Sequence, residues 1–534
     1  MRKCFIILSA AGIIAFAAIL VPPVFEKIIS VIVENSYSWH LDQRGFVKSE
    51  LLHAAVGGIL FSVLLLAACF NFLQRSIQTL CKIITRNYNK LYWPLICLPF
   101  VIRIAVIMIF GVNTPIGEDW MSVNTIMPQI LESTITWGGF LKFVQNSIYW
   151  SPVPFISVSV LGLLTSLNVK LILVIASFVW LIPYLCFVFY IRKRTNSADA
   201  ESKTKALLIT IVLGIIFNNL AQRDQILKMT ASIFGAFSLG FTVLAFYLFE
   251  LAFNQNGRRQ IIIMVFFVFS VIISVFSWIP GFIIIPAILC TLILIVFNKE
   301  GRAAKYIIFC LFTAALVFAM NYYCHTLTGG TRLFNSYKNP AISLITFIVQ
   351  TGNVTGCAFI APFAGIIFLI SSAALVLWLV KIKRVKQNLF PIFLIAEGWG
   401  FGIGTMIDRS NGSLLSMLAT HRAVGGIFIV CGLMLIIWRE FLSASEPKAS
   451  RIAARFMIKP LFCTVAAFSI LSNFLVIPAV NFKKEYTYFR EMILNYKNLP
   501  RSRFEEIPEN IFYFGNLDML ETLEKNAWLG FPKN

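Results

Sequence analysis

The sequence predicts an all-α protein, a polytopic bundle of about thirteen transmembrane helices with interfacial helices on its outer face. Of the 534 residues, 58% are hydrophobic and only 13% are charged, whereas a soluble domain carries about 25% charged residues. Several separate apolar stretches of about 20 residues are each long enough to cross a hydrocarbon core of about 30 Å as a helix. The alternating pattern of membrane β-strands is absent.

The basic clusters between the apolar stretches predict the topology. Short cytoplasmic connections carry an excess of Lys and Arg, and the clusters here are Arg2/Lys3, Arg75–Lys90, Arg192–Lys205, Arg258/Arg259, Lys299–Lys305, Lys381–Lys386 and Arg439–Lys459. With every cluster inside, the predicted spans are Cys4–Phe25, Ala55–Gln74, Pro94–Val112, Val169–Ile191, Ala206–Leu220, Ala231–Phe253, Ile261–Trp278, Pro280–Phe297, Tyr306–Tyr323, Phe359–Val380, Leu389–Ile407, Ala423–Trp438 and Leu461–Val480. We therefore expect a multi-pass membrane protein with a cytoplasmic N-terminus and an extracytoplasmic C-terminus.

Two further apolar segments are interpreted as interfacial or re-entrant helices on the outer face. Counting Ser151–Leu167 as a span would place Arg192–Arg194 outside, against the charge bias. Ala341–Val349 is interpreted in the same way, and the amphipathic stretch Phe482–Tyr496 is expected at the membrane surface. The chain then divides into an N-terminal hairpin with its basic connection (residues 1–93), a transmembrane core with an outer acidic loop (94–480) and an extracytoplasmic tail (481–534).

The formal net charge of +21 does not indicate nucleic-acid binding, because the basic residues lie in short clusters between apolar stretches, as membrane topology requires. The sequence contains no nucleotide-binding glycine motif and no metal-ligand spacing. We therefore expect no cofactor, while a requirement for a divalent metal stays open. Cys324 and Cys357, at the two ends of one outer loop, either form a disulfide or lie separately within helix ends.

The outer loop after the third span contains Glu118 and Asp119 next to Trp120. A carboxylate at this place can act as a general base toward a hydroxyl acceptor. The alternative is a solvated loop in which Asp119 caps a helix. Substitution of Asp119 by Asn is expected to preserve the fold, because the two side chains are nearly isosteric.

Cationic side chains on the outer face are candidates for phosphate binding. In one predicted outer turn, Arg223 and Lys228 would hold phosphate and Asp224 would orient them; the alternative is a wet hairpin turn. The other candidates are Arg332, Arg409, His421 and Arg422. Basic residues outside run against the charge bias, so either an anionic lipid phosphate or a salt bridge with Asp408 would account for the late group.

Two charged residues fall inside predicted spans, Arg103 and Glu397. Charges at such depth are costly and face a bundle interior or a cavity. We expect them to pair with each other. In an alternative interpretation they line a transport path.

The order of these features resembles the GT-C class of membrane glycosyltransferases. The resemblance lies in Glu118-Asp119 in the first large outer loop, in Tyr149–Pro154 opening an interfacial helix, in the Arg223-Asp224 turn and in Asp408-Arg409 with His421-Arg422 before a late span. Many members carry a His-x-Pro segment after the acidic loop, whereas here Ser151 precedes Pro152 and no His is present. The likeness is to bacterial proteins of surface-glycan loci, which implies the bacterial inner membrane. The resemblance implies a polyprenyl-phosphate-linked sugar as donor, an extracytoplasmic site and an acidic residue of the first outer loop as base.

The predicted function is therefore a membrane glycosyltransferase of the hexosyltransferase type, of the kind that modifies O-antigen, lipopolysaccharide or other surface glycans. Asp119 would deprotonate the acceptor, with Glu118 as the alternative base, and the guanidinium groups would stabilise the leaving phosphate. The partners would be the polyprenyl-phosphate-linked sugar, a glycan or lipid acceptor and membrane lipids. The alternatives are an O-antigen polymerase-like glycan-assembly protein and a transporter or flippase.

Overall fold

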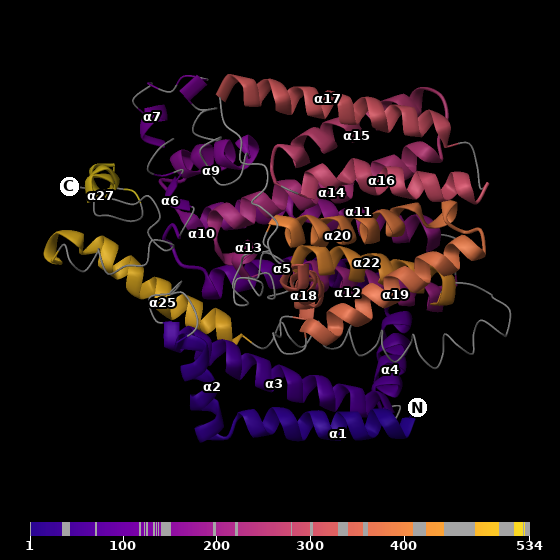
Figure 1. Cartoon of the computed structure of the whole chain (residues 1–534), viewed down its shortest axis with the longest axis horizontal. Coiled ribbons are helices and arrows are strands. Elements are labelled where there is room, and N and C mark those ends of the chain that lie inside the picture. The colour runs from indigo at the N-terminus through magenta and orange to yellow at the C-terminus, as the bar shows by residue number, and fades with distance from the viewer. Residues whose placement is uncertain are drawn as a thin grey trace.

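The computed structural model describes residues 2–34, 43–69, 72–116, 119–121, 123, 127–131, 134, 136, 138–139, 151–195, 199–218, 223–278, 280–299, 303–328, 340–355, 361–408, 423–442, 476–500, 517–526 and 528. Throughout these residues every regular element is a helix. Most of the long helices run side by side, with the N-terminus at one end of the bundle and the helices α25 and α27 at the other (Figure 1). The prediction of an all-helical fold is confirmed for this part of the chain, and its long apolar helices are consistent with a membrane protein.

The N-terminal helices are α1 (Arg2–Ile19), α2 (Pro22–Glu34), α3 (Gln43–Cys69) and α4 (Phe72–Arg86). The predicted span Cys4–Phe25 is not one helix, because the chain bends by 75° between α1 and α2. Pro22 and Pro23 stand at the break. Their missing N–H groups end α1, while their fixed φ angle suits the first turn of α2. In Figure 1, α4 crosses the direction of the other helices near the N-terminal end.

The middle of the chain forms α5 (Tyr88–Phe110), α6 (Asp119–Met121), α7 (Met127–Leu131), α9 (Pro152–Leu164), α10 (Val169–Val179), α11 (Leu181–Thr195), α12 (Ala200–Phe217), α13 (Arg223–Leu227), α14 (Met229–Phe253), α15 (Arg258–Val275) and α16 (Pro280–Phe297). The later elements are α17 (Ala304–Thr328), α18 (Pro340–Gly352), η3 (Asn353–Thr355), α19 (Ala361–Lys381), η4 (Lys386–Asn388), α20 (Leu389–Asp408), α22 (Val424–Ile437), the π-helix η6 (Trp438–Leu442), α25 (Ile477–Leu494), η8 (Tyr496–Asn498) and α27 (Leu517–Lys525).

Among the described residues, seven helical segments are long and apolar enough to cross a membrane, or eight if α1 and α2 form one bent span. The seven are Val47–Leu64, Tyr88–Phe110, Val169–Thr195, Met229–Phe253, Arg258–Val275, Pro280–Phe297 and Ala361–Lys381. Each overlaps a predicted span. The last predicted span, Leu461–Val480, lies mostly outside the described residues, and the total of thirteen stays a prediction.

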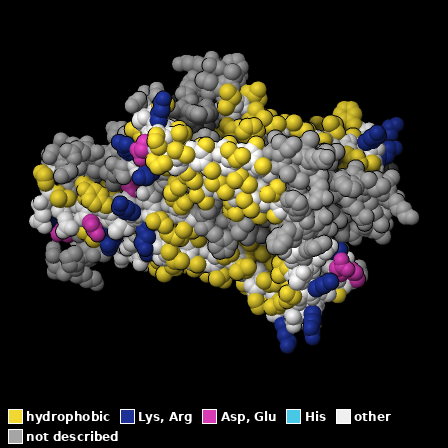
Figure 2. Space-filling view, turned by 90° about the horizontal axis from the view of Figure 1, so that it is seen from below, with side chains coloured by type: hydrophobic (Ala, Val, Ile, Leu, Met, Phe, Trp, Pro, Cys, Tyr) yellow, Lys and Arg dark blue, Asp and Glu magenta, His cyan; other side chains and the backbone are white. Residues whose placement is uncertain are grey.

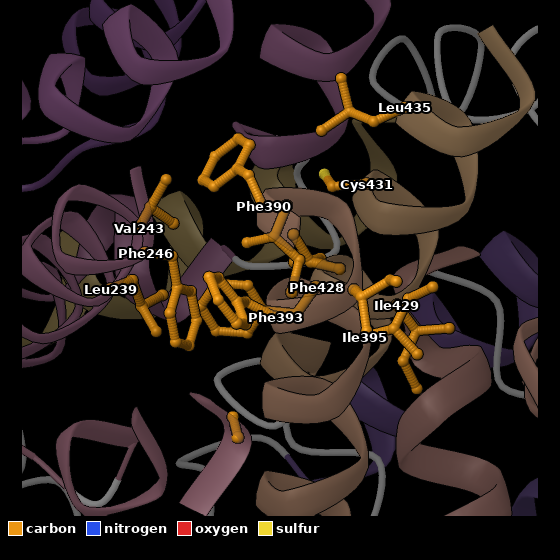
Figure 3. Close-up of a cluster of buried hydrophobic side chains, with 14 of the residues drawn as sticks. Leu239, Val243, Phe246, Phe390, Phe393, Ile395, Phe428, Ile429, Cys431 and Leu435 are labelled. Atoms are coloured by element: carbon orange, nitrogen blue, oxygen red, sulfur yellow. The ribbon is translucent and has the colours of Figure 1, made fainter. Parts of the chain in front are cut away.

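The core of the bundle surrounds α14, the most deeply packed of these helices. Aromatic side chains connect it to α20: the ring centroids of Phe246 and Phe393 are 5.5 Å apart, and those of Phe249 and Phe393 are 5.7 Å apart. Figure 3 shows Phe246, Phe390, Phe393 and Phe428 meeting where α14, α20 and α22 converge. In a membrane, such dense packing replaces the hydrophobic effect as the force between helices.

Glycine allows α20 and α22 to approach closely. A Cβ atom added to Gly398 would lie 2.4 Å from the carbonyl oxygen of Gly425. Such a distance is a steric clash with the backbone, so only glycine fits at position 398. Small residues at helix crossings are typical of membrane bundles.

The described residues of six predicted cytoplasmic clusters lie together at one end of the bundle, which we call the basic end. Thr85 Oγ1 donates to Thr204 Oγ1 at 2.9 Å, which joins the Arg75–Lys90 cluster to the start of α12. Three further contacts join the remaining clusters: Gln260 with Tyr306, Asn298 with the Val380 carbonyl, and Arg384 with Glu440. The chain therefore returns to the same end of the bundle at each of these clusters, as the charge bias predicts.

The end of α14 joins the basic end to the core. Arg194 forms an ion pair with Glu250 in the last turn of α14. The other carboxylate oxygen of Glu250 accepts from the backbone N–H of Phe390 at 2.9 Å, in the first turn of α20. In Figure 2, hydrophobic side chains fill the middle of the visible face, and Lys and Arg side chains gather toward its two ends. This distribution suits a lipid-facing middle between two aqueous interfaces.

The opposite end, which holds the loop after α5, is the Asp119 end. Both ends of α9 lie there. The backbone N–H of Val153 donates to the Phe276 carbonyl, just after α15, at 3.2 Å. After α9, the N–H of Val169 donates to Asn113 Oδ1 at 2.7 Å, in the loop after α5. Helix α9 therefore does not cross the bundle, as the interfacial interpretation of Ser151–Leu167 requires.

Candidate functional site

Asp119, the first residue of α6, is buried against the start of α14. Its side chain is only 1% exposed. Oδ1 accepts from the backbone N–H of Thr230 at 2.7 Å, and Oδ2 accepts from the backbone N–H of Ile116 at 2.9 Å. Thr230 is the second residue of α14, so the carboxylate satisfies one of the four free N–H groups of that helix end. Asp119 thus caps a helix, but a distant one instead of its own.

Burial raises the pKa of the Asp119 carboxyl above its usual range. The hydrogen bonds from Thr230 and Ile116 and the positive charge of Lys228 favour the carboxylate and offset part of this effect. A carboxyl group whose pKa is raised toward neutrality is a better general base than a fully solvated one. The same burial keeps the carboxylate away from solvent, so an acceptor hydroxyl would reach it only if the surrounding loop moved.

Helix α13 brings the predicted basic turn to the same place. Lys228 directly precedes α14, where its charge acts on Asp119. Arg223 forms an ion pair with Glu50 of α3. The structure therefore gathers Asp119, Lys228 and Arg223 at one end of the bundle, although more than 100 residues separate the first from the others.

The remaining predicted site residues are not part of this described group. Glu118, Arg332, Arg409, His421 and Arg422 lie outside the described residues, as do the side chains of Asp224 and Asp408. The same holds for the side chain of Cys324 and for Cys357, so the choice between a disulfide and separate cysteines stays open.

Arg103 occupies a buried polar pocket between five helical segments. Its guanidinium donates to Ser177 Oγ at 3.0 Å, to the Gln225 carbonyl at 2.9 Å and to Ser232 Oγ at 3.2 Å. A longer contact of 3.4 Å reaches Asn218 Oδ1. The guanidinium carbon also lies 4.4 Å from the ring centroid of Trp180. Neutral oxygens and an aromatic face, instead of a carboxylate, thus surround this cation.

The expected ion pair between Arg103 and Glu397 is wrong. Glu397 is fully buried in α20, and neither of its carboxylate oxygens has a hydrogen-bond partner. The sequence placed both charges inside spans, but it could not show that Arg103 faces the start of α14 while Glu397 lies elsewhere. Arg103 is satisfied by backbone and hydroxyl oxygens, which carry no sequence signature.

The tail helix α25 contacts the acidic loop, which the sequence did not predict. Arg490 Nε donates to the backbone carbonyl of Asn113 at 3.3 Å, across 377 positions of sequence. The rings of Trp120 and Phe489 meet edge to face with centroids 6.4 Å apart. The apolar face of the amphipathic helix was the only signal, and it does not say which surface that face covers.

Across the described residues, no group of three or more His, Cys, Asp or Glu side chains is arranged to hold a metal ion. The sequence matches no protein-family model, and no curated protein is significantly similar to it. The geometry at the Asp119 end is therefore the basis for any functional assignment.

Proposed function

We propose that this protein is a membrane glycosyltransferase that moves a sugar from a polyprenyl-phosphate donor to a surface glycan or lipid acceptor. The observation that carries the proposal is the gathering of Asp119, Arg223 and Lys228 at the end of the bundle opposite the basic clusters. A base and two cations are what transfer from a lipid phosphate requires. The membrane would be a bacterial inner membrane, with the Asp119 end outside and the basic end in the cytoplasm.

In the proposed reaction, the acceptor O–H loses its proton to a carboxylate of the acidic loop. The acceptor oxygen forms a bond to the anomeric carbon, and the bond between that carbon and the phosphate oxygen breaks. The electron pair leaves with the polyprenyl phosphate, whose charge the guanidinium and ammonium groups stabilise. Asp119 would act as base after the loop opens, and Glu118, two residues beyond Ile116, is the alternative.

Arg223 and Glu50 provide a matched test. Arg223→Gln and Glu50→Gln break the same ion pair, but only the first removes a cation. The variants would be expressed in a strain that lacks the gene, and the surface glycans would be analysed by mass spectrometry. We expect Arg223→Gln to abolish the modification and Glu50→Gln to retain it. Equal losses in both variants, with equally lowered folding stability, would show that Arg223 serves the structure only.

A transporter or flippase is the second candidate, because Glu397 is an unpaired buried acid within the bundle. Acidic residues at such depth mark ion or proton pathways in many membrane proteins. In that case Glu397→Gln would abolish transport of a lipid-linked substrate across reconstituted vesicles. A transferase would keep its activity in the same variant, since Glu397 does not belong to the Asp119 group.

A further inference from the structure

An apolar groove lies on the bundle surface between α15 and α17. Its volume is about 430 Å³, and its walls are formed by Ile261, Met264, Val265, Val268, Phe269 and Ile272 of α15 with Phe309 of α17. Ile261, Val265 and Phe269 are 65%, 49% and 59% exposed. The groove is therefore open along its length instead of enclosed.

One end of the groove is polar and lies at the basic end of the bundle. Gln260 and Tyr306 close it: Gln260 Nε2 donates to the Tyr306 hydroxyl at 2.6 Å and to the Ala252 carbonyl at 3.0 Å. Lys305 also lines this end, with its ammonium 4.8 Å from the centroid of the Tyr306 ring. Polar and cationic groups at one end with apolar walls beyond them match the two parts of a lipid molecule.

Three cations adjoin the residues of this polar end in sequence: Arg258 and Arg259 directly precede Gln260, and Lys305 directly precedes Tyr306. Arg258, Arg259 and Lys305 are all exposed, and within the described residues none of them forms a salt bridge. Their positive charge is therefore available to an anion at the membrane surface. Basic pockets between transmembrane helices on the cytoplasmic side are known to suit anionic lipid head groups.

The length of the groove selects the kind of chain that fills it. Gln260 and Ile272 are twelve residues apart on α15, which corresponds to about 18 Å along a helix. Half of a hydrocarbon core is about 15 Å thick. The groove thus spans about one leaflet, the depth of a single acyl chain, whereas a polyprenyl chain is far longer.

We propose that this groove binds an anionic diacyl phospholipid, with one acyl chain along α15 and the phosphate beside Arg258, Arg259 and Lys305. The site is separate from the proposed transferase site, and its polar end lies at the opposite end of the bundle. Its lipid would come from the leaflet that faces the basic clusters. It would contact both helices and so help to hold α15 and α17 together.

Native mass spectrometry of the full-length protein, titrated with phosphatidylglycerol or phosphatidylcholine, tests this site. We expect tighter binding of phosphatidylglycerol than of phosphatidylcholine. The affinity for phosphatidylglycerol should fall about fivefold in Lys305→Gln and again in Arg259→Gln, which is the usual effect of one basic residue near an anionic surface. The control Lys193→Gln removes an exposed cation from α11 at the same end and should leave the titration unchanged.

Filling the groove tests the apolar part separately. Val268→Trp places an indole among the lining side chains, and Ile308→Trp adds the same bulk at a 68% exposed position of α17 outside the groove. We expect Val268→Trp alone to remove the preferred binding. Equal affinity for the two lipids, or loss in neither charge variant, would overturn the site. Preferential binding of undecaprenyl phosphate by the same residues would overturn the proposed occupant.

Discussion

Asp119 Oδ1 accepts a hydrogen bond of 2.7 Å from the backbone N–H of Thr230, 111 positions later in the sequence. The bond attaches the acidic loop to the N-terminal turn of α14, the helix around which the core is packed. The residue proposed as catalytic base therefore also stabilises the fold. Any test of its chemistry must separate the two roles.

We predict that Asp119→Asn destabilises the protein, contrary to the expectation from its near-isosteric shape. Both carboxylate oxygens accept backbone N–H groups, whereas Asn has one acceptor oxygen and an NH₂ group that cannot accept. One buried N–H loses its partner, at a cost of about 2 kcal/mol. Thermal unfolding in detergent would show the loss. An unchanged midpoint would mean that the two hydrogen bonds do not form in solution.

The pH dependence of the folding stability should follow the direction in which the Asp119 pKa is shifted. Because burial raises that pKa in the folded protein, the contribution of Asp119 is full below its unfolded pKa of about 3.9 and is lost as the pH rises through the folded value. The midpoint difference between wild type and Asp119→Asn should therefore shrink from pH 4 upward.

Asp199 gives the opposite sign and serves as a control. Its carboxylate accepts from the backbone N–H of Ser202 at the start of α12. A hydrogen bond from the Ser202 side chain, together with this backbone bond, lowers its pKa. Its contribution is present above the unfolded pKa and is lost as the pH falls through the folded one. The difference in unfolding midpoint between wild type and Asp199→Asn should grow with rising pH, whereas the difference between wild type and Asp119→Asn should shrink. Parallel slopes would contradict the assignment for Asp119.

Arg103→Met should be among the most damaging single substitutions. It removes hydrogen bonds to Ser177, Gln225 and Ser232 at once and leaves buried oxygens without donors. Bonds to a charged donor contribute about 1.5–3 kcal/mol each, so we expect loss of most of the folding stability. Lys90→Met, an exposed cation on the same helix, should change the unfolding midpoint little. Similar midpoints for both variants would show that the Arg103 pocket is dispensable.

Glu397→Gln should leave folding stability within about 1 kcal/mol of wild type, since no hydrogen bond to the carboxylate is lost. Glu440→Gln is the matched control, because Glu440 is also buried but binds Arg384 and Asn388. That variant should lose about 2 kcal/mol. Unfolding midpoints of the two variants, measured side by side, decide this. A large loss for Glu397→Gln would reveal a partner for its carboxylate.

Labelling can test the placement of the two bundle ends. Single cysteines at Lys193 and Glu491, exposed on α11 and α25, would be introduced into a protein whose native cysteines are replaced. A membrane-impermeant maleimide should label Lys193→Cys only in inverted vesicles and Glu491→Cys only in intact cells. Labelling of both from one side would contradict the division into a basic end and an Asp119 end.

The sequence alone determined the class of fold and the two-ended distribution of charge. Apolar length predicts which segments become membrane helices, because the bilayer sets that length for every span. The basic clusters predicted one shared end, since each connection obeys the charge bias independently of the others. The same count predicted that α9 does not cross the bundle, which the contacts at its two ends bear out. These properties depend on the local composition of each segment, which can be read directly from the sequence.

The tertiary structure decided which charged residues meet. Arg103 lies against neutral oxygens of four segments and not against Glu397, and Asp119 caps α14 instead of standing free in a loop. Backbone carbonyls and amides satisfy these groups, and every residue possesses such groups, so no sequence pattern marks the partner. Long-range pairing depends on the order and rotation of the packed helices, which composition and periodicity do not specify.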